Sequence, residues 1–148
     1  MRTALHWFMG ITLFLQTVTA YAMETIVLEI NNQSFVLEVP LRERELMQGL
    51  MFRHFLAKKH GMLFLFDPER KRRVTMWMKN TYLSLDMLFI DSNDVIVCTI
   101  EKTRPLSMEL IDCGPGIAAV IELNAGEIKQ YGLARGMKLH ASTSHFEN

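Results

Sequence analysis

The sequence predicts a mainly β domain of the α+β class, in which a single, largely antiparallel sheet curls into a barrel or sandwich and carries one or two short helices. Two observations predict this class. Short segments in which apolar and polar residues alternate recur along the chain, and turn residues separate them as in hairpins. Regular alternation of strands with longer helices is missing, so a parallel βαβ sheet is not expected. We expect about eight short strands and two short helices.

The first half of the domain begins with a hairpin. Residues 25–30 and 34–39 each alternate between apolar and polar side chains, and Asn and Gln residues suited to a turn lie between them. A short helix is predicted over residues 41–48, and Gly49 suits its C-terminal cap. The apolar run at residues 62–66 is short enough to be a buried strand.

The second half continues the pattern of short strands. Five more are predicted, at residues 74–78, 85–90, 95–100, 117–123 and 137–141. Asn124 can cap a second short helix with Glu127 three residues on, and Gly132 would end it. Residues 102–116 form the longest irregular segment, and such segments in compact domains tend to be functional or disordered.

The N-terminal segment has the three parts of a secretory signal. Arg2 supplies a positive charge, residues 7–15 form a short apolar stretch, and an Ala-Tyr-Ala cleavage site ends at Ala22. The apolar stretch is shorter than the roughly 20 residues that span a bilayer, and no Cys follows as a lipid anchor. We therefore expect a signal peptide over residues 1–22 and a mature chain that starts at Met23, periplasmic or secreted. An uncleaved N-terminal anchor is the alternative.

The mature chain is expected to form a single domain over residues 23–141 with a frayed tail over residues 142–148. Without Arg2, the mature chain has 15 basic and 16 acidic residues, so its charge does not indicate nucleic-acid binding. We expect a monomer without a cofactor. Its expected partner is a small molecule or a component of the cell envelope.

Two cysteines, Cys98 and Cys113, remain in a chain expected to enter an oxidising compartment. A disulfide between them would close a loop of about 15 residues and contribute roughly 3 kcal/mol in the chain-entropy model. The alternative is that Cys98, inside an apolar strand pattern, is a small buried hydrophobic residue. A catalytic role for Cys113 is weakly supported, because no His lies near it in sequence.

The best candidate site lies in residues 74–91, where Lys79, Asn80 and Asp86 stand between two strongly apolar runs. Burying such groups without partners costs about 1–3 kcal/mol each, so they must reach water, one another or a ligand. If the strand stays extended, Trp77 and Lys79 share a face. Lys79 could then lie along the Trp77 ring or pair with Asp86.

Two non-enzymatic roles are open for this segment. In a binding module, Lys79, Asn80, Thr81 and Asp86 would form a ligand site, with donors for an anionic or sugar-like ligand and Trp77 as a flat apolar wall. In a structural or partner-binding protein, the same groups would only satisfy one another, and Asn80 would brace a turn. The binding module is the reading we favour.

An enzyme is the other alternative. A hydrolase or transferase could use Asp86 as a base and Lys79 as an electrostatic stabiliser. No second carboxylate, Ser or His accompanies them in a catalytic pattern, so the sequence leans away from catalysis. For the binding module, Arg53 could add positive charge and residues 102–116 could act as a lid.

Five motifs occur in a fixed order along the chain. They are Gly-Leu-Met-Phe-Arg at 49–53, Gly-Met-Leu-Phe at 61–64, Trp-Met-Lys-Asn-Thr at 77–81, Leu-Asp-Met-Leu-Phe-Ile-Asp at 85–91 and a Gly-Leu…Gly pattern at 132–136. Together they closely resemble domain-of-unknown-function family 192, which comprises small, often exported prokaryotic proteins. The resemblance implies a compact β-rich domain and brings no established activity, substrate or cofactor.

The chain departs from the family pattern in three places. Ser84 stands where the family usually has Pro before Leu-Asp, and Met137 stands where Asp is usual. The long loop of the family often carries its own pair of cysteines, whereas only Cys113 lies in that loop here. The resemblance therefore does not determine a disulfide.

Metal binding has little support in the sequence. Nine methionines in the mature chain could suggest Cu(I), because thioethers prefer soft metals. Most of them lie in apolar runs, where Met fills irregular gaps in a core. The mature-chain histidines, His54, His60, His140 and His145, show no metal-binding spacing. We therefore expect no metal site.

The basic segment Arg70, Lys71, Arg72 and Arg73 could make weak contact with anionic lipid head groups, with a gain on the order of 1 kcal/mol for each charge. The alternative, which we favour, is a solvated hairpin end that protects a sheet edge from aggregation.

Overall fold

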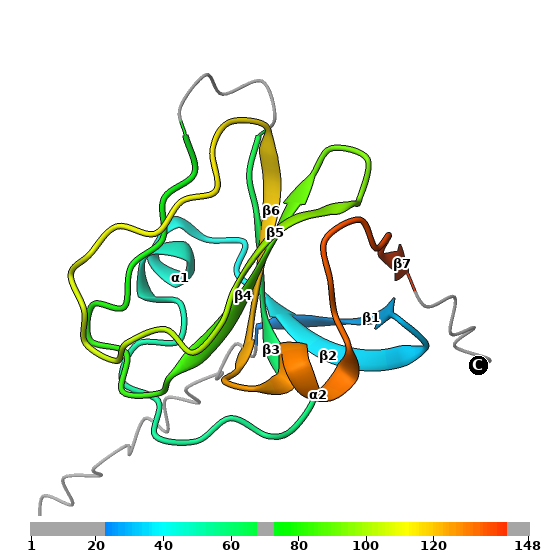
Figure 1. Ribbon diagram of the computed structural model, residues 1–148. Helices are drawn as coiled ribbons and strands as arrows, with labels where there is room; N and C mark the ends of the chain where they lie inside the picture. The colour runs from blue at the N-terminus through cyan, green and yellow to red at the C-terminus, as the bar shows by residue number, and fades with distance from the viewer. Residues whose placement is uncertain (1–22, 68–72, 142–148) are drawn as a thin grey trace, which may run out of the picture.

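The computed structural model describes residues 23–67 and 73–141, which form one curved sheet with two short helices (Figure 1). Within these residues the sheet has seven strands in the order β5-β4-β6-β3-β2-β1-β7. The elements are β1 (Glu24–Ile30), β2 (Gln33–Val39), α1 (Glu43–Gln48), β3 (His60–Leu65), β4 (Leu85–Asp91), β5 (Ile96–Ile100), β6 (Ile117–Asn124), α2 (Glu127–Tyr131) and β7 (His140–Ala141). The expected signal segment 1–22, tail 142–148 and most of the basic segment 70–73 lie outside the described residues.

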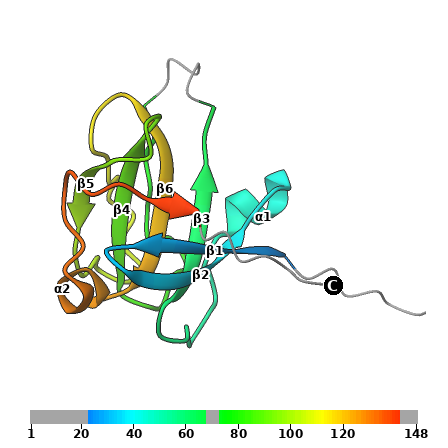
Figure 2. The ribbon, with the colours of Figure 1, turned by 90° about the vertical axis from the view of Figure 1, so that its right-hand side faces the viewer.

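The topology confirms the predicted class. Every neighbouring pair of strands is antiparallel except β2 and β3, and the chain forms hairpins β1-β2 and β4-β5. The sheet bends so that β1 and β2 run across the direction of β3, β4 and β6 (Figure 2). It does not close into a continuous barrel. One C-terminal segment links its two edges, because β7 pairs with β1 while Lys138 forms an isolated bridge with Val95, the residue before β5.

The strands place apolar side chains on both faces of the sheet, and each face has its own core. The first face packs against α2 through Ile128 and includes Phe35, Leu88 and Ile121. The second face is covered by irregular segments. Its fully buried side chains include Met62, Met78, Leu85, Met87 and Phe89. This division into two faces decides which polar residues can meet a ligand.

Residues 74–78 do not form the predicted strand. Met76 makes an isolated antiparallel bridge with Ile111, and the Met78 amide donates to the Ser107 carbonyl at 3.1 Å. The facing segment is irregular, so an extended ladder cannot form despite the apolar pattern of 74–78. The last predicted strand is shorter than expected, because Met137 and Leu139 bond to the backbone of Ile96 and Asp94 instead. Only two of its residues pair with β1.

The predicted cap of the second helix is also wrong. Asn124 belongs to β6, and its amide donates to the carbonyls of Leu56 and Ala57 at 3.2 and 3.0 Å. Gly126 is the N-cap of α2, with a φ of 92° that favours glycine. The predicted C-caps are confirmed, since α1 ends at Gly49 and α2 ends at Gly132.

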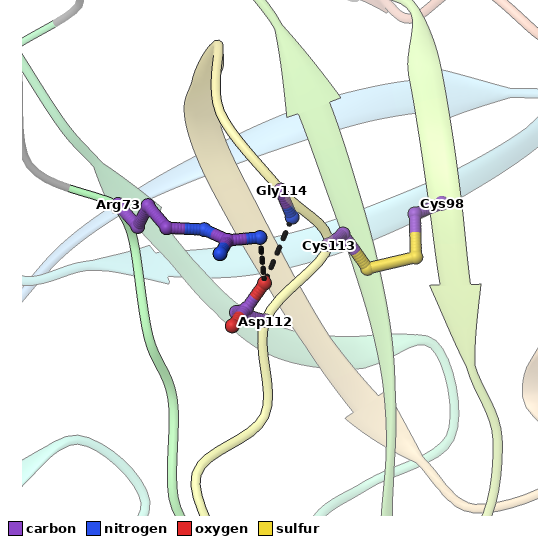
Figure 3. Close-up of a disulfide and its surroundings, with 5 residues drawn as sticks. All are labelled: Arg73, Cys98, Asp112, Cys113 and Gly114. Atoms are coloured by element: carbon purple, nitrogen blue, oxygen red, sulfur yellow. Dashed lines mark hydrogen bonds and ion pairs between the residues drawn. A yellow bond between two sulfur atoms is a disulfide. The ribbon is translucent and has the colours of Figure 1, made fainter.

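A disulfide joins Cys98 of β5 to Cys113 in the irregular segment, with 6.0 Å between their Cα atoms (Figure 3). Beside it, Asp112 accepts a hydrogen bond from the Gly114 amide and lies 3.0 Å from the Arg73 guanidinium. The disulfide holds residues 101–116 against the β4-β5 hairpin. Among the described residues, no helix is both long and apolar enough to cross a bilayer.

Candidate functional site

The Trp-Met-Lys-Asn-Thr motif forms a tight turn that connects two other loops. The Asn80 carbonyl accepts a hydrogen bond from the Phe52 amide at 2.8 Å, and the Thr81 carbonyl accepts one from the Leu106 amide at 3.0 Å. Asn80 has a φ of 54°, a left-handed conformation that Asn tolerates better than most residues. Asn80 therefore acts mainly through its backbone.

Lys79 and Trp77 share a face, as the alternation predicted. The Lys79 ammonium lies 5.0 Å from the centre of the Trp77 ring, a cation–π geometry. Trp77 is half-buried. The basic side chain thus rests on the indole, and it makes no ion pair with Asp86.

Asp86 is fully buried and has a different set of partners. One carboxylate oxygen accepts the Lys102 amide at 2.8 Å, and the other accepts the amides of Gly126 and Ile128 at 2.8 and 2.9 Å. These three bonds join β4, the segment after β5 and the start of α2. Asp86 is therefore a structural anchor. The enzyme alternative loses the Asp86–Lys79 pair on which it depended.

Arg53 is likewise committed to a structural partner. Its guanidinium forms a bidentate ion pair with Glu38 of β2, with both N–O distances at 2.5 Å. This pairing raises the pKa of Arg53. Arg53 thus does not add free positive charge to a ligand site.

The second face of the sheet carries a cleft with a volume of about 590 Å³. Its wall comes from α1, from the end of β3, from residues 75–77 and from Leu110 of the long loop. Its lining residues are Glu43, Leu46, Met47, Gln48, Gly49, Leu50, Met51, Phe64, Leu65, Phe66, Asp67, Thr75, Met76, Trp77, Thr81, Leu110 and Glu122. Of the residues predicted as a site, the cleft includes Trp77 and Thr81, and Lys79 lies beside it on Trp77.

The charge of the described lining is acidic. Glu43, Asp67 and Glu122 are its only ionisable residues, and none of its described members is Lys, Arg or His. An anionic ligand, as expected from Lys79 and Arg53, does not match this lining. The reason is that both basic side chains are held elsewhere, one on Trp77 and the other on Glu38.

Glu122 was not among the predicted site residues. It lies on β6 opposite Met62 of β3 and Met87 of β4, both fully buried. Glu122 is 5% exposed, and no hydrogen bond from the described residues contributes to the pKa of its carboxyl group. Burial raises the pKa of Glu122 to about 8, because the charged form loses its hydration.

A sequence signal for Glu122 was present. Residues 117–123 read Ile-Ala-Ala-Val-Ile-Glu-Leu, a continuous apolar run broken by one acid. A strand that is apolar on both faces is a central strand, so its one charged residue must be buried whichever face it occupies. Alternation puts Glu122 on the same face as Val120, opposite to Ile121 and Leu123.

A second buried acid lies on the α2 side. One oxygen of Glu127 accepts the Lys59 amide at 2.8 Å, while the other has no hydrogen-bond partner among the described residues. Burial is the main cause of a raised pKa for Glu127, and the nearby Asp86 charge adds to it. Glu127 does not line the cleft described above, and its bonded oxygen ties the loop before β3 to α2.

A second hollow, of about 710 Å³, lies beside the disulfide. It is a shallow surface region lined mainly by small and polar residues, with Arg135 as its basic member. It lacks an aromatic wall and a buried polar group, so it offers less for a ligand than the cleft. In residues 23–67 and 73–141, no three His, Cys, Asp or Glu side chains gather in a way that could hold a metal ion.

Comparisons with known proteins agree on the fold. The family model DUF192, described as an uncharacterised ACR family, matches residues 26–141. A Sinorhizobium meliloti protein named as a candidate transcription regulator is 37% identical, with a TM-score of 0.75 over 82% of this chain and 97% of that one. A Novosphingobium aromaticivorans protein of unknown function is 25% identical, with a TM-score of 0.71 over 88% of this chain and 99% of that one. No match was found among curated proteins.

Proposed function

The chain belongs to the DUF192 family, and we propose that it is an exported binding protein whose cleft holds a small, mainly apolar ligand. The observation that supports this most directly is the cleft of about 590 Å³, with Trp77 in its wall and Glu122 as an unpartnered polar group. Ligand sites in proteins are typically hollows of roughly 300–1,000 Å³ with apolar walls and a few placed polar groups.

The apolar character of the ligand follows from the rim and the walls. Met47, Leu65 and Leu110 line the cleft and are each more than half exposed. Exposed apolar groups that converge on a hollow gain free energy by contact with an apolar ligand, at about 25 cal/mol per Å² removed from water. Phe64 and Trp77 add aromatic surface that suits a hydrocarbon chain or ring.

Ligand binding can be measured through Trp77. A mature chain that starts at Met23 lacks Trp7, so Trp77 is then its one tryptophan. We expect a saturable change in its fluorescence on titration with 1-octanol, a soluble apolar probe with a hydroxyl group. Absence of any saturable change, together with unaltered melting in the presence of the probe, would contradict the proposed function.

A matched pair of variants keeps this test specific. Leu110→Asp places a charge on the exposed rim of the cleft, and we expect it to weaken octanol binding severalfold. Leu106→Asp is the control, because Leu106 is exposed on the same loop but does not line the cleft. An equal loss of octanol affinity in both variants would show that the loop, and not the cleft, controls the fluorescence change.

Export is supported by the signal sequence that ends at Ala22. The test is fractionation of a Gram-negative cell that expresses the full chain, with N-terminal sequencing of the product. We expect the protein in the periplasmic fraction with Met23 as its first residue. Recovery in the membrane fraction with Met1 retained would instead indicate an N-terminal anchor.

A further inference from the structure

We propose that the ligand of the cleft carries a protonated amine at one end of its apolar body, and that this amine pairs with the carboxylate of Glu122. This inference rests on the proposed function, since it specifies the ligand of the same cleft. It goes further by assigning Glu122 as the residue that selects among apolar molecules of similar size.

Glu122 lacks a hydrogen-bond donor on the strands beside it. Both strands that flank it place a fully buried methionine opposite it, so neither offers a donor. A buried carboxyl group without a partner is costly, and such groups in native proteins call for an explanation. Its position in the lining of the cleft provides one, because a bound ligand can supply the missing partner.

The charged groups around Glu122 also bear on the ligand. The other ionisable residues of the described lining are Glu43 of α1 and Asp67 after β3, and Asp67 already has an interaction partner. Lys79 is held over the Trp77 ring and does not line the cleft. The described lining holds no basic residue that would compete with a cation for the Glu122 carboxylate.

An amine suits Glu122 better than a neutral hydroxyl group does. A hydroxyl group could form one hydrogen bond with Glu122 but would leave the charge of its carboxylate without a counterion. An ammonium group supplies both donors and charge, and charge-assisted hydrogen bonds are roughly twice as strong as neutral ones. Trp77 and Phe64 would then contact the apolar body of the ligand.

Binding would also release a proton. Burial raises the pKa of Glu122 to about 8, so the empty cleft holds the carboxyl group mainly in its protonated form at pH 7. An alkyl ammonium remains protonated there, because amines of this kind titrate near pH 10. The arriving cation favours the carboxylate, and the displaced proton goes to solvent. Affinity for the amine should therefore rise between pH 6 and pH 8, by up to about tenfold per unit.

The experiment compares three probes of equal chain length, octylamine, 1-octanol and octanoate, on the chain from Met23 with Trp77 fluorescence as the readout. At pH 8 we expect octylamine to bind at least tenfold more tightly than octanol, and octanoate to bind most weakly. In Glu122→Gln the preference for the amine should disappear while octanol binding persists. Glu127→Gln is the control, and the preference should remain because Glu127 is a buried acid that does not line the cleft.

The outcomes are distinguishable. Equal affinity for octanol and octylamine, or an amine preference that survives in Glu122→Gln, would overturn the inference and leave the binding function intact. Failure of all three probes to bind would contradict both. If Glu122→Gln does not fold, the parent protein still decides the matter. Octylamine affinity that rises with pH while octanol affinity stays constant supports the inference, and parallel profiles overturn it.

Discussion

Asp86 and Glu122 are both buried carboxyl groups on neighbouring strands, yet they lie on opposite faces of the sheet and have opposite surroundings. Asp86, on the α2 face, accepts three backbone amides at 2.8–2.9 Å. Glu122, on the cleft face, accepts none from the described residues and has its pKa raised to about 8. Burial alone therefore does not identify a functional acid. The number of partners that the fold already supplies separates an anchor from a group left open for a ligand.

The largest expected effect is the loss of stability when Asp86 is replaced. Asp86→Ala would leave three backbone amides without their acceptor at the junction of β4, the loop after β5 and α2. Hydrogen bonds to a charged group contribute about 1.5–3 kcal/mol each and do not add fully, so we expect a loss of roughly 3–5 kcal/mol in the free energy of unfolding. Urea unfolding followed by circular dichroism measures it. A loss below about 1 kcal/mol would mean that Asp86 is not an anchor.

The next largest effect is expected in residues 101–116, which contribute contacts on both faces of the sheet. Residues 101–116 supply the Lys102 amide to Asp86 and Leu110 to the cleft, and the disulfide fixes their far end. The double variant Cys98→Ser and Cys113→Ser should lose about 3 kcal/mol of stability. We expect octanol binding to weaken as well, because Leu110 is less well held. Unchanged binding in a destabilised variant would show that the cleft forms without this segment.

A pH-dependent effect should follow from Glu122. The folded protein holds this proton up to about pH 8, whereas an unfolded Glu releases it near 4.5, so the folded state binds more protons between these values. The stability that the proton contributes is fully present below pH 4.5 and is lost as the pH rises to 8, at no more than about 1.4 kcal/mol per unit. Glu122→Gln should remove much of this loss between pH 5 and 7.

The measurement is the midpoint of urea unfolding across that pH range for both proteins. Glu127 also has a raised pKa, so a smaller slope of the same sign should remain in Glu122→Gln. Glu127→Gln is the companion variant, and it should remove that remainder. Identical slopes in the parent and in Glu122→Gln would indicate that Glu122 titrates normally in the folded protein.

The smallest effect tests the ion pair that the sequence allowed between Lys79 and Asp86. Lys79→Ala removes a cation–π contact with Trp77 at a partly exposed site, which costs about 0.5–1 kcal/mol. In a double-mutant cycle with Asp86→Asn, we expect a coupling energy below about 0.3 kcal/mol, because the two side chains share no partner. A larger coupling would show that the two charges interact after all.

The candidate site was only partly predictable. Trp77, Lys79 and Thr81 were found because a polar cluster inside an apolar run is visible in sequence, and the shared face of Trp77 and Lys79 follows from alternation. The partners of Asp86 were not predictable, since two of its three donors lie about 40 residues away, at the N-cap and in the first turn of α2. Glu122 left a readable signal as the one acid in a central strand, although the sequence could not say what faced it.

By itself the sequence determined the class of fold, the β1-β2 and β4-β5 hairpins and the glycine caps Gly49 and Gly132. These features depend on side-chain alternation and backbone conformation within a few residues, so the local chain carries the information. Only the tertiary structure decided which face of the sheet would bear a cleft, and hence which buried acid would stay unpartnered. The physical reason is that α1, α2 and the long loop reach the two faces from distant parts of the chain, and the donors that they bring satisfy Asp86 but not Glu122.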